Sequence, residues 1–311
     1  MPGFRRLYPP AVASGSRALW FVFHDADLVI RNGAAWPLLE GSTDAPETGP
    51  VATPILIGEF DGLPLLAGAW LPGALVPDGY ETTGLRALFA RGDEQMSALA
   101  GCAAQLLRWQ RTMRFCPACA SPLAPVSGSW GRRCTACEYS AYPPINPAII
   151  VLIHDDAGRA LLTTRTGWGK RYSLVAGFVE PGETFEQCVV REVREEVGVD
   201  VADVCYVSSQ AWPFPHQIMV GFMARYTGGA IAVDHNELAD AAWFTRNDLP
   251  ELPPPFTISR RIIELWRSGG QTLNVERLLP ILRQHIFSRR AEGIDCQRRL
   301  EGLDRVWYVA R

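Results

Sequence analysis

Three glutamates near the middle of the chain have the spacing of a metal site. Glu192, Glu195 and Glu196 lie at i, i+3 and i+4, so on a helix their carboxylates share one face. Such a cluster repels itself unless cations are bound, and Mg²⁺ is held in proteins by one or two carboxylates together with waters and phosphate oxygens. The spacing therefore indicates a metal-dependent phosphate site. A solvated acidic helix face is the alternative.

The residues around these glutamates predict the loop and helix that must hold them. Residues 184–197 contain neither Pro nor Gly and carry apolar side chains at helical spacing. Glycines precede and follow this segment, as expected for a loop–helix–loop unit. We expect Arg191 and Glu183 to pair and to fix the loop against the helix, outside the chemistry. The whole segment 177–199 follows the pattern G-x5-E-x7-R-E-U-x-E-E-x-G-U, in which U is aliphatic.

Four cysteines form a second group with metal-ligand spacing. They occur as two C-x2-C pairs with fourteen residues between the pairs. Each pair lets two thiolates reach one ion, so the two pairs predict a closed, structural zinc ribbon, with two disulfides or a redox pair as alternatives. The predicted zinc ligands are Cys116, Cys119, Cys134 and Cys137. We expect the other cysteines to be free, namely Cys102, Cys188, Cys205 and Cys296.

Composition limits the kind of protein that carries these sites. The chain has 311 residues, of which 48% are hydrophobic, and a formal charge of -3. This length permits two domains, or two plus a small module. The charge indicates no general duplex-binding surface, so we expect any RNA contact to be local and directed to a terminal nucleotide. No apolar run reaches the length of a membrane span, and the N-terminus lacks the apolar core of a signal peptide. We therefore expect a soluble, cytoplasmic protein.

Apolar periodicity divides the chain into regions. Short apolar runs between Gly- and Pro-rich turns predict an α/β or β-rich N-terminal region, which ends in a helix over residues 95–114. Beyond the cysteines, strands alternate with two helices, 184–197 and 258–268, and this mixture predicts an α/β/α sandwich. The predicted strands include 147–153, 159–165, 201–210 and 218–226. We divide the chain into an N-terminal domain (1–110), a zinc ribbon (111–144), a catalytic domain (145–269) and a C-terminal extension of unassigned role (270–311).

The chain resembles the Nudix hydrolases and, among them, the NADH pyrophosphatases that also remove NAD caps from RNA. The resemblance rests on the 177–199 segment, the cysteine pairs and a third motif, Ser209-Gln-Ala-Trp-Pro-Phe-Pro215, and it covers residues 106–263. Ala211 replaces the usual Pro of that motif, and His216 with Gln217 stands where the family commonly has Gln-Ser. The implied fold is α/β, a Nudix α/β/α sandwich with a zinc ribbon and an N-terminal α/β, β-rich domain.

The resemblance also implies roles for individual residues in substrate binding. Tyr142 and Phe178 match a pair that stacks on the substrate base, although a hydrophobic bridge between ribbon and catalytic domain is an alternative for Tyr142. Gln210 matches a residue that hydrogen-bonds to substrate. Arg86 resembles an arginine that reaches substrate across a dimer interface, with a plain surface residue as the alternative. The other implied substrate-binding residues are Ala211, Trp212, Pro213, Phe214, Pro215, His216, Gln217 and Ser259.

The implied cofactors are two or three catalytic Mg²⁺ or Mn²⁺ ions. Their implied ligands are Glu192, Glu195, Glu196, Glu237 and the backbone carbonyl of Ala176, with the role of general base as a second possibility for Glu237. The implied reaction is hydrolysis of the pyrophosphate of NADH or NAD⁺ to nicotinamide mononucleotide and AMP, and of NAD caps on RNA 5′ ends, by a homodimer. Two alternatives stay open: a Nudix hydrolase that prefers ADP-ribose or another dinucleotide, and a non-catalytic nucleotide- or RNA-binding protein.

Overall fold

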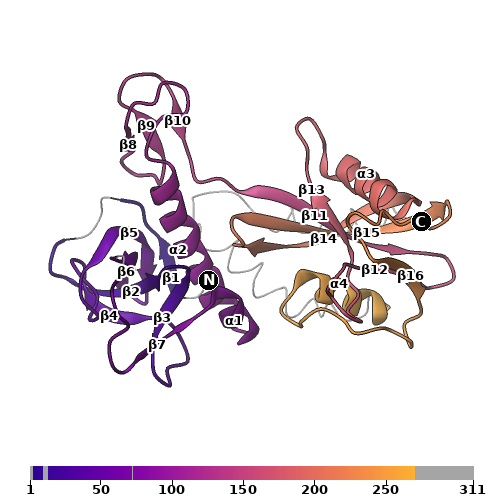
Figure 1. The fold of residues 1–311 in the computed structure, drawn as a ribbon, viewed down its shortest axis with the longest axis horizontal. Helices are drawn as coiled ribbons and strands as arrows, with labels where there is room; N and C mark the ends of the chain where they lie inside the picture. The colour runs from indigo at the N-terminus through magenta and orange to yellow at the C-terminus, as the bar shows by residue number, and fades with distance from the viewer. Residues whose placement is uncertain (1–2, 10–12, 72, 270–311) are drawn as a thin grey trace, which may run out of the picture. The chain divides into compact units, whose positions relative to one another are not determined.

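The computed structural model describes residues 3–9, 13–71 and 73–269 (Figure 1). In the N-terminal region, seven strands form one sheet in the order β1-β5-β6-β2-β3-β7, with β4 paired to β2. The strands are β1 (Phe4–Arg6), β2 (Arg17–His24), β3 (Asp27–Arg31), β4 (Leu39–Ser42), β5 (Val51–Phe60), β6 (Leu63–Trp70) and β7 (Tyr80–Thr83). β2 and β6 run in parallel. The prediction of a β-rich N-terminal region is confirmed.

Two helices follow this sheet, α1 (Leu85–Ala90) and α2 (Glu94–Thr112). Asp93 caps the start of α2, because its side chain accepts a hydrogen bond from the backbone N–H of Met96. The buried face of α2 packs on the sheet, and its Leu99 joins a core with side chains from β2, β5 and β6. The helix ends shortly before the cysteine pairs and so leads the chain into the ribbon.

The ribbon is a small three-stranded sheet in the order β10-β9-β8. Its strands are β8 (Leu123–Pro125), β9 (Arg132–Cys134) and β10 (Ser140–Ala141). Two of the four cysteines, Cys116 and Cys134, are buried together with Leu123. A sheet of this size buries little apolar surface, so its stability depends on what the cysteines bind.

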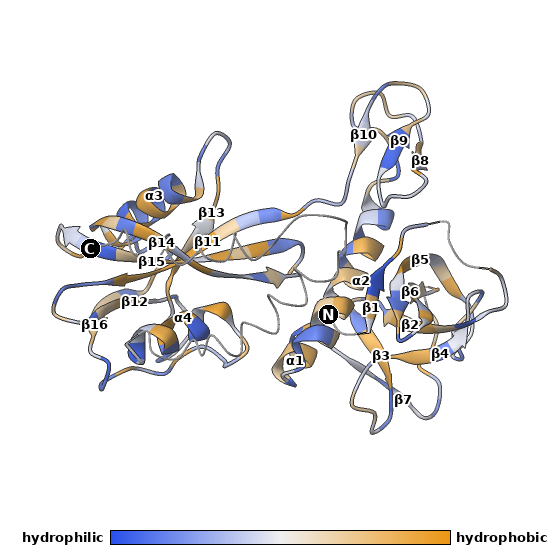
Figure 2. Cartoon of the chain, turned by 180° about the vertical axis from the view of Figure 1, so that it is seen from behind, coloured by the Kyte–Doolittle hydropathy of each residue, from blue (hydrophilic) through white to orange (hydrophobic). Residues whose placement is uncertain are grey.

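The catalytic region contains a six-stranded mixed sheet in the order β14-β15-β11-β12-β16, with β13 paired to β11. Its strands are β11 (Asn146–His154), β12 (Ala160–Thr164), β13 (Val175–Phe178), β14 (Asp200–Trp212), β15 (Gln217–Gly228) and β16 (Asp240–Phe244). β11 and β15 run in parallel at the centre. Both strands are rich in apolar residues, as expected for strands covered on two faces (Figure 2).

Helices cover the two faces of this sheet (Figure 1). On one face, the buried side of α3 (Phe185–Val197) packs Val189 and Val193 against β11 and β15. On the other face, α4 (Ile258–Arg267) lies against Gly221 of β15, where a methyl group would approach Ile262 to 2.6 Å. Alternate residues of a strand point to opposite faces, and neighbours of Gly221 belong to the core under α3. The predicted α/β/α sandwich is confirmed.

The structure extends or shortens several predicted elements. The strand expected at 201–210 runs on to Trp212, so the first four residues of the Ser209–Pro215 motif lie in β14. The helix expected at 95–114 ends at Thr112. No helix in the described part of the chain is long and apolar enough to cross a membrane. The predicted extension 270–311, which includes Cys296, lies outside the described residues.

Candidate active site

Helix α3 is held in place at both ends by local interactions. The Thr184 hydroxyl accepts a hydrogen bond from the backbone N–H of Gln187, and the Gln187 side chain accepts one from the backbone N–H of Thr184. This capping box satisfies two of the free N–H groups at the helix start. At the other end, Gly198 adopts a left-handed conformation with φ of 73°. The caps fix where the helix begins and ends, and hence where its glutamates lie.

Two of the three clustered glutamates are buried, although each is an ionisable group. The exposed fraction is 8% for Glu192 and 2% for Glu196, whereas Glu195 is exposed. Burial raises the pKa of Glu192, and it raises the pKa of Glu196 to about 8 against the opposing effect of Arg165. Oε2 of Glu196 is buried and has no hydrogen-bond partner in the described protein. A cation at this oxygen would remove the penalty of burial, so the donor set fits a divalent metal.

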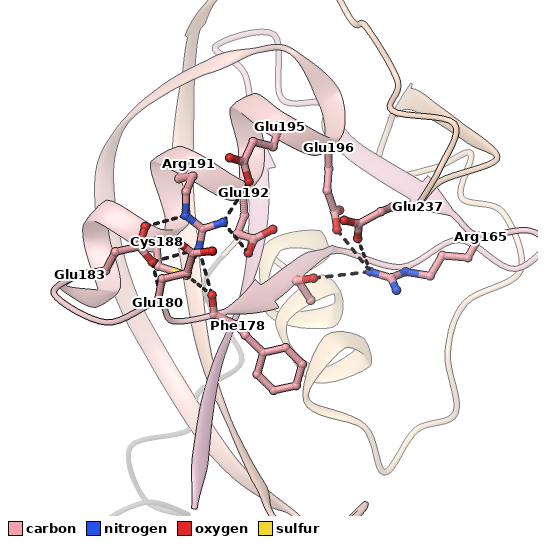
Figure 3. Close-up of polar contacts among 11 residues, drawn as sticks. Arg165, Phe178, Glu180, Glu183, Cys188, Arg191, Glu192, Glu195, Glu196 and Glu237 are labelled. Carbon is pink, nitrogen blue, oxygen red and sulfur yellow. Dashed lines mark hydrogen bonds and ion pairs between the residues drawn. The ribbon is translucent and has the colours of Figure 1, made fainter.

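Strand β13 provides both space and a further oxygen beside α3. A Cβ atom on Gly177 would lie only 1.8 Å from Cδ of Glu192. A side chain at this position would force the Glu192 carboxylate or β13 to move, because the carboxylate occupies the place of that side chain. The neighbouring Ala176 lies in the same strand, paired to Ile150 of β11, and its carbonyl oxygen points toward the side chain of Arg165 at 3.5 Å (Figure 3).

Arg191 connects the loop and the glutamates (Figure 3). Its Nε and Nη2 donate to Glu183 at 2.5 and 2.9 Å, so the predicted pair is confirmed. The guanidinium holds the pKa of Glu183 down at about 2. Nη1 of Arg191 also donates to Glu192 at 2.8 Å and to Glu195 at 2.9 Å, so the arginine contacts two of the clustered carboxylates, and its place outside the chemistry stays a prediction.

Arg165, just beyond the end of β12, is a site residue that sequence reasoning missed. Its Nη2 lies 3.2 Å from Oε1 of Glu196 and 3.9 Å from Oε2 of Glu237. The structure thus brings the separately predicted Glu196, Glu237 and Ala176 together around one arginine. The only sequence signal was a basic residue directly after a buried strand, which is too common to single out.

The glutamates do not gather as closely as metal ligands do. Within the described ranges, the four cysteines are the one group in which three or more candidate ligand atoms all lie within 4.8 Å of one another. Arg165 contacts Glu196 and Glu237, and Arg191 contacts Glu192 and Glu195.

Gln210 of the third motif is engaged by the protein itself. Its Nε2 donates to the carbonyl of Phe256, and its Oε1 accepts from the backbone N–H of Ile258, both at 2.8 Å. These bonds tie β14 to the first turn of α4, where Ser259 is buried with its hydroxyl 3.1 Å from that of Thr257. Gln210 therefore positions the segment that carries Ser259.

The aromatic residues of the motif form a packed group. The rings of Trp212 and Phe214 lie 4.9 Å apart, edge to face, and each lies edge to face with Phe89. The guanidinium carbon of Arg86 lies 4.1 Å from the centre of the Phe214 ring. Arg86 is exposed and is thus in cation–π contact with the motif at the protein surface, and its role toward substrate stays a prediction.

The remaining predicted substrate-binding residues lie at the turn between β14 and β15 or near it. Ala211 and Trp212 pair with Ile218 and Gln217 across the two strands, and Pro213 packs on Gly101 of α2. The Phe214–Pro215 bond is cis. The His216 carbonyl accepts from the N–H of Asn146, whereas its Nδ1 is buried without a partner among the described residues.

Tyr142 and Phe178 are both exposed, as residues that stack on a ligand would be. No ring contact joins them in the part of the chain that the structure describes. The Tyr142 ring lies over Gly131 of the ribbon, where a Cβ atom would approach it to 2.7 Å. Its exposure argues against the alternative of a buried bridge. The stacking role stays a prediction.

The four ribbon cysteines have the geometry of a zinc site. The sulfur atoms of Cys116 and Cys137, Cys119 and Cys134, and Cys119 and Cys137 lie 3.7, 3.4 and 3.6 Å apart. A tetrahedral ion with Zn–S bonds of about 2.3 Å places its sulfurs about 3.8 Å apart, whereas a disulfide needs about 2.05 Å. The disulfide alternative is wrong for these pairs, and the four thiols form a structural zinc site. The prediction of free cysteines is confirmed for Cys102, Cys188 and Cys205.

The sequence matches three domain families in chain order. Residues 17–109 match the NADH pyrophosphatase-like rudimentary NUDIX domain, residues 111–142 the NADH pyrophosphatase zinc ribbon domain, and residues 144–266 the NUDIX domain. Together with the sandwich and the buried glutamates of α3, these matches define the class of the protein as a Nudix hydrolase.

Relatives named as NAD-capped RNA hydrolases resemble the chain over most of its length. The NAD-capped RNA hydrolase NudC of Pseudomonas putida (strain W619) is 43% identical over 68% of this chain and 78% of the relative. That of Deinococcus radiodurans is 40% identical over 81% of this chain and 89% of the relative. A solved NUDIX hydrolase from Nitrosomonas europaea is 21% identical over 51% of this chain and 94% of its own, with a TM-score of 0.40. The chain belongs to the NudC family of Nudix hydrolases.

Proposed function

We propose that this hydrolase cleaves the pyrophosphate of NADH and NAD⁺ to nicotinamide mononucleotide and AMP, and that it removes NAD caps from RNA 5′ ends. The observation that carries the proposal is the pair of buried carboxylates, Glu192 and Glu196, on a capped helix beside the Ala176 carbonyl. The relatives named NAD-capped RNA hydrolase support the choice of substrate, because they resemble this chain through the ribbon and the catalytic domain.

We assign Mg²⁺ or Mn²⁺ to the site formed by the clustered glutamates. The proposed ligands are Glu192, Glu195, Glu196, Glu237 and the carbonyl of Ala176. The unpartnered Oε2 of Glu196 supports this assignment, as does the space that Gly177 leaves for the Glu192 carboxylate. When bound, such ions neutralise the pyrophosphate oxygens and lower the pKa of the attacking water. The protein contributes fixed carboxylates, because α3 is capped and Arg191 restrains two of them.

The proposed substrate-binding residues hold the two nucleotides on either side of the pyrophosphate. Tyr142 and Phe178 offer exposed rings to a flat base. Gln210 and Ala211 line a cavity of about 450 Å³ together with Phe256. The hydrogen bonds of Gln210 to the protein support an indirect role in which it holds Ser259 in place. Trp212 and Phe214, packed edge to face, stiffen the turn beside this cavity.

We also propose the domain boundaries of the chain, its oligomeric state and its location. We assign residues 1–110 to the N-terminal domain, 111–144 to the ribbon, 145–269 to the catalytic domain and 270–311 to an extension of unassigned role. A homodimer in the cytoplasm completes the proposal, in which Arg86 and its aromatic partner Phe214 lie near substrate. Light scattering of the purified protein tests the dimer.

A side-by-side kinetic assay tests the proposed substrate. The zinc-loaded protein is supplied with Mn²⁺ or Mg²⁺ and with NADH, NAD⁺, a short NAD-capped RNA, ADP-ribose or a diadenosine polyphosphate. We expect the highest kcat/KM for NAD species and products of nicotinamide mononucleotide and AMP. A clear preference for ADP-ribose would contradict the assigned substrate. Failure to cleave any dinucleotide would favour a nucleotide- or RNA-binding protein.

A further inference from the structure

One nitrogen atom occupies the point at which three proposed metal-ligand oxygens converge. Nη2 of Arg165 lies 3.2 Å from Oε1 of Glu196, 3.5 Å from the carbonyl oxygen of Ala176 and 3.9 Å from Oε2 of Glu237. The oxygens come from α3, from β13 and from the segment before β16, and Figure 3 shows the side chains of Glu196 and Glu237 directed at the Arg165 guanidinium. Two carboxylates and a carbonyl form an oxygen set that a hard divalent cation prefers.

The guanidinium neutralises this oxygen set only in part. The distances from Nη2 of Arg165 to the three oxygens exceed the 2.0–2.1 Å of a Mg²⁺–oxygen bond. The guanidinium is also planar, so each of its N–H groups points in a fixed direction. Oε2 of Glu196 consequently keeps no partner in the described protein, although the residue is only 2% exposed. A small cation can approach both oxygens of Glu196 where Nη2 of Arg165 reaches one.

Arg165 and a divalent cation cannot hold the same position. Both are positive, and a cation at bonding distance from these oxygens would overlap Nη2. Arg165 has room to leave, because its side chain is 40% exposed and it follows the last residue of β12. Its side chain contacts Glu196, Glu237 and the carbonyl of Ala176, so its departure breaks few interactions.

We propose that Arg165 is an internal competitor of the catalytic metal, a counter-cation that holds the acidic site together until a divalent cation displaces it. This inference rests on the proposed metal site and adds a residue that sets its affinity. Arg165 is therefore expected to have opposite effects on the stability of the metal-free protein and on its affinity for the first divalent ion. Arg165 attracts Glu237 and the ionised form of Glu196 and so stabilises the protein without divalent metal, and for the same reason it weakens the binding of the first ion.

The test measures Mn²⁺ binding without substrate. Zinc-loaded wild type and Arg165→Gln are dialysed free of other divalent ions without a strong chelator, which would strip the ribbon. Mn²⁺ is then titrated, and the free ion is followed by its electron paramagnetic resonance signal. We expect Arg165→Gln to bind Mn²⁺ about fivefold more tightly, the size that follows from removing one half-exposed ion pair. Its melting temperature before Mn²⁺ addition should be lower, and the rise on Mn²⁺ addition should be larger.

Arg171 offers a matched control, because its side chain is 42% exposed and it pairs with Glu251 away from α3. Arg171→Gln removes the same charge and should leave Mn²⁺ affinity unchanged. If it tightens binding as much as Arg165→Gln, the effect is one of net charge and the proposal is overturned. Unchanged or weaker binding by Arg165→Gln also overturns it.

A second variant protects the test against misfolding. Arg165→Lys keeps the charge on a shorter side chain without the planar fork, so we expect an affinity between those of wild type and Arg165→Gln; an affinity tighter than that of Arg165→Gln contradicts the competition. The outcome for the proposed substrate is separate. If wild type binds Mn²⁺ but fails to cleave NADH, the proposed function fails while the competition by Arg165 stands. If no variant binds Mn²⁺, both fail.

Discussion

The zinc site of the ribbon and the proposed site for divalent cations at α3 are built on opposite principles. In the ribbon, four sulfur atoms already lie at the separations that one tetrahedral ion needs. At α3, no three carboxylates of the described residues come as close together as the cysteines do, and Arg165 and Arg191 each contact two of them. A closed thiolate site serves stability and has no open position, whereas a site that must admit substrate phosphates and waters cannot be closed. The difference indicates that counter-ions, rather than close packing of ligands, keep the acidic site in order.

The largest effect on activity is expected from a substitution of Glu196, the buried carboxylate of α3. Glu196→Gln keeps the shape of the side chain but removes the carboxyl group whose Oε2 lacks a partner, and an amide cannot ionise to bind a cation. We expect NADH turnover with Mn²⁺ to fall at least about a thousandfold, since metal stabilisation of a transition state is worth several kcal/mol. The fold should survive, because a neutral side chain suits this buried position better than a carboxylate. Kinetics together with circular dichroism measures both properties, and near-normal activity would contradict the metal role.

The ribbon should respond in the reverse way, through structure. Cys119→Ser leaves three thiols for the zinc ion, and we expect zinc content to fall from about one ion per chain to a small fraction of that value. Elemental analysis measures the metal, and limited proteolysis within residues 111–142 reports the loss of the ribbon fold. Cys205→Ser changes an exposed free cysteine and serves as the control. A stable, zinc-loaded Cys119→Ser protein would contradict the four-cysteine site.

The difference between the two sites also explains which parts of the molecule were predictable from sequence. The ribbon ligands and the α3 glutamates follow from short spacings, because local geometry determines which side chains share a turn or a helix face. Arg165 lies 31 residues from Glu196, and Gln210 lies 46 residues from Phe256. These contacts depend on how strands pair and helices dock, so no local sequence pattern predicts them. The strand and helix types were predictable from apolar periodicity, and their pairing order was not.

Gly177 tests whether the acidic site depends on the exact placement of a carboxylate. In Gly177→Ala the new Cβ would meet Cδ of Glu192 at 1.8 Å, so the carboxylate or β13 must move. A misplacement of about 1 Å at a reacting site costs about a hundredfold in rate, and we expect kcat to fall by roughly that factor. Gly84→Ala is the control, because its nearest neighbour, Oδ1 of Asp27, is 3.4 Å away and its φ is -67°. Equal kcat values for Gly177→Ala and wild type would show that Glu192 does not need this position.

The smallest expected effect concerns Arg191, the counter-ion that has a partner outside the acidic face. Its hydrogen bonds depress the pKa of Glu183 from 4.5 to about 2, so the pair stabilises the folded state fully above pH 4.5 and loses that contribution as the pH falls toward 2. We therefore expect Glu183→Gln to be less stable than wild type at pH 7, by an amount that is constant down to about pH 5 and shrinks below pH 4.5.

Urea unfolding at several pH values measures this difference in the free energy of unfolding. The ribbon responds to acid equally in both proteins, so its contribution cancels when the two values are subtracted. Glu180→Gln, which removes an exposed carboxylate and keeps the backbone N–H that Glu183 accepts from, should show no such dependence. A difference between wild type and Glu183→Gln that persists at pH 2.5 would mean that the Gln variant loses packing rather than charge pairing, and Arg191 would then be a structural clamp more than a counter-ion.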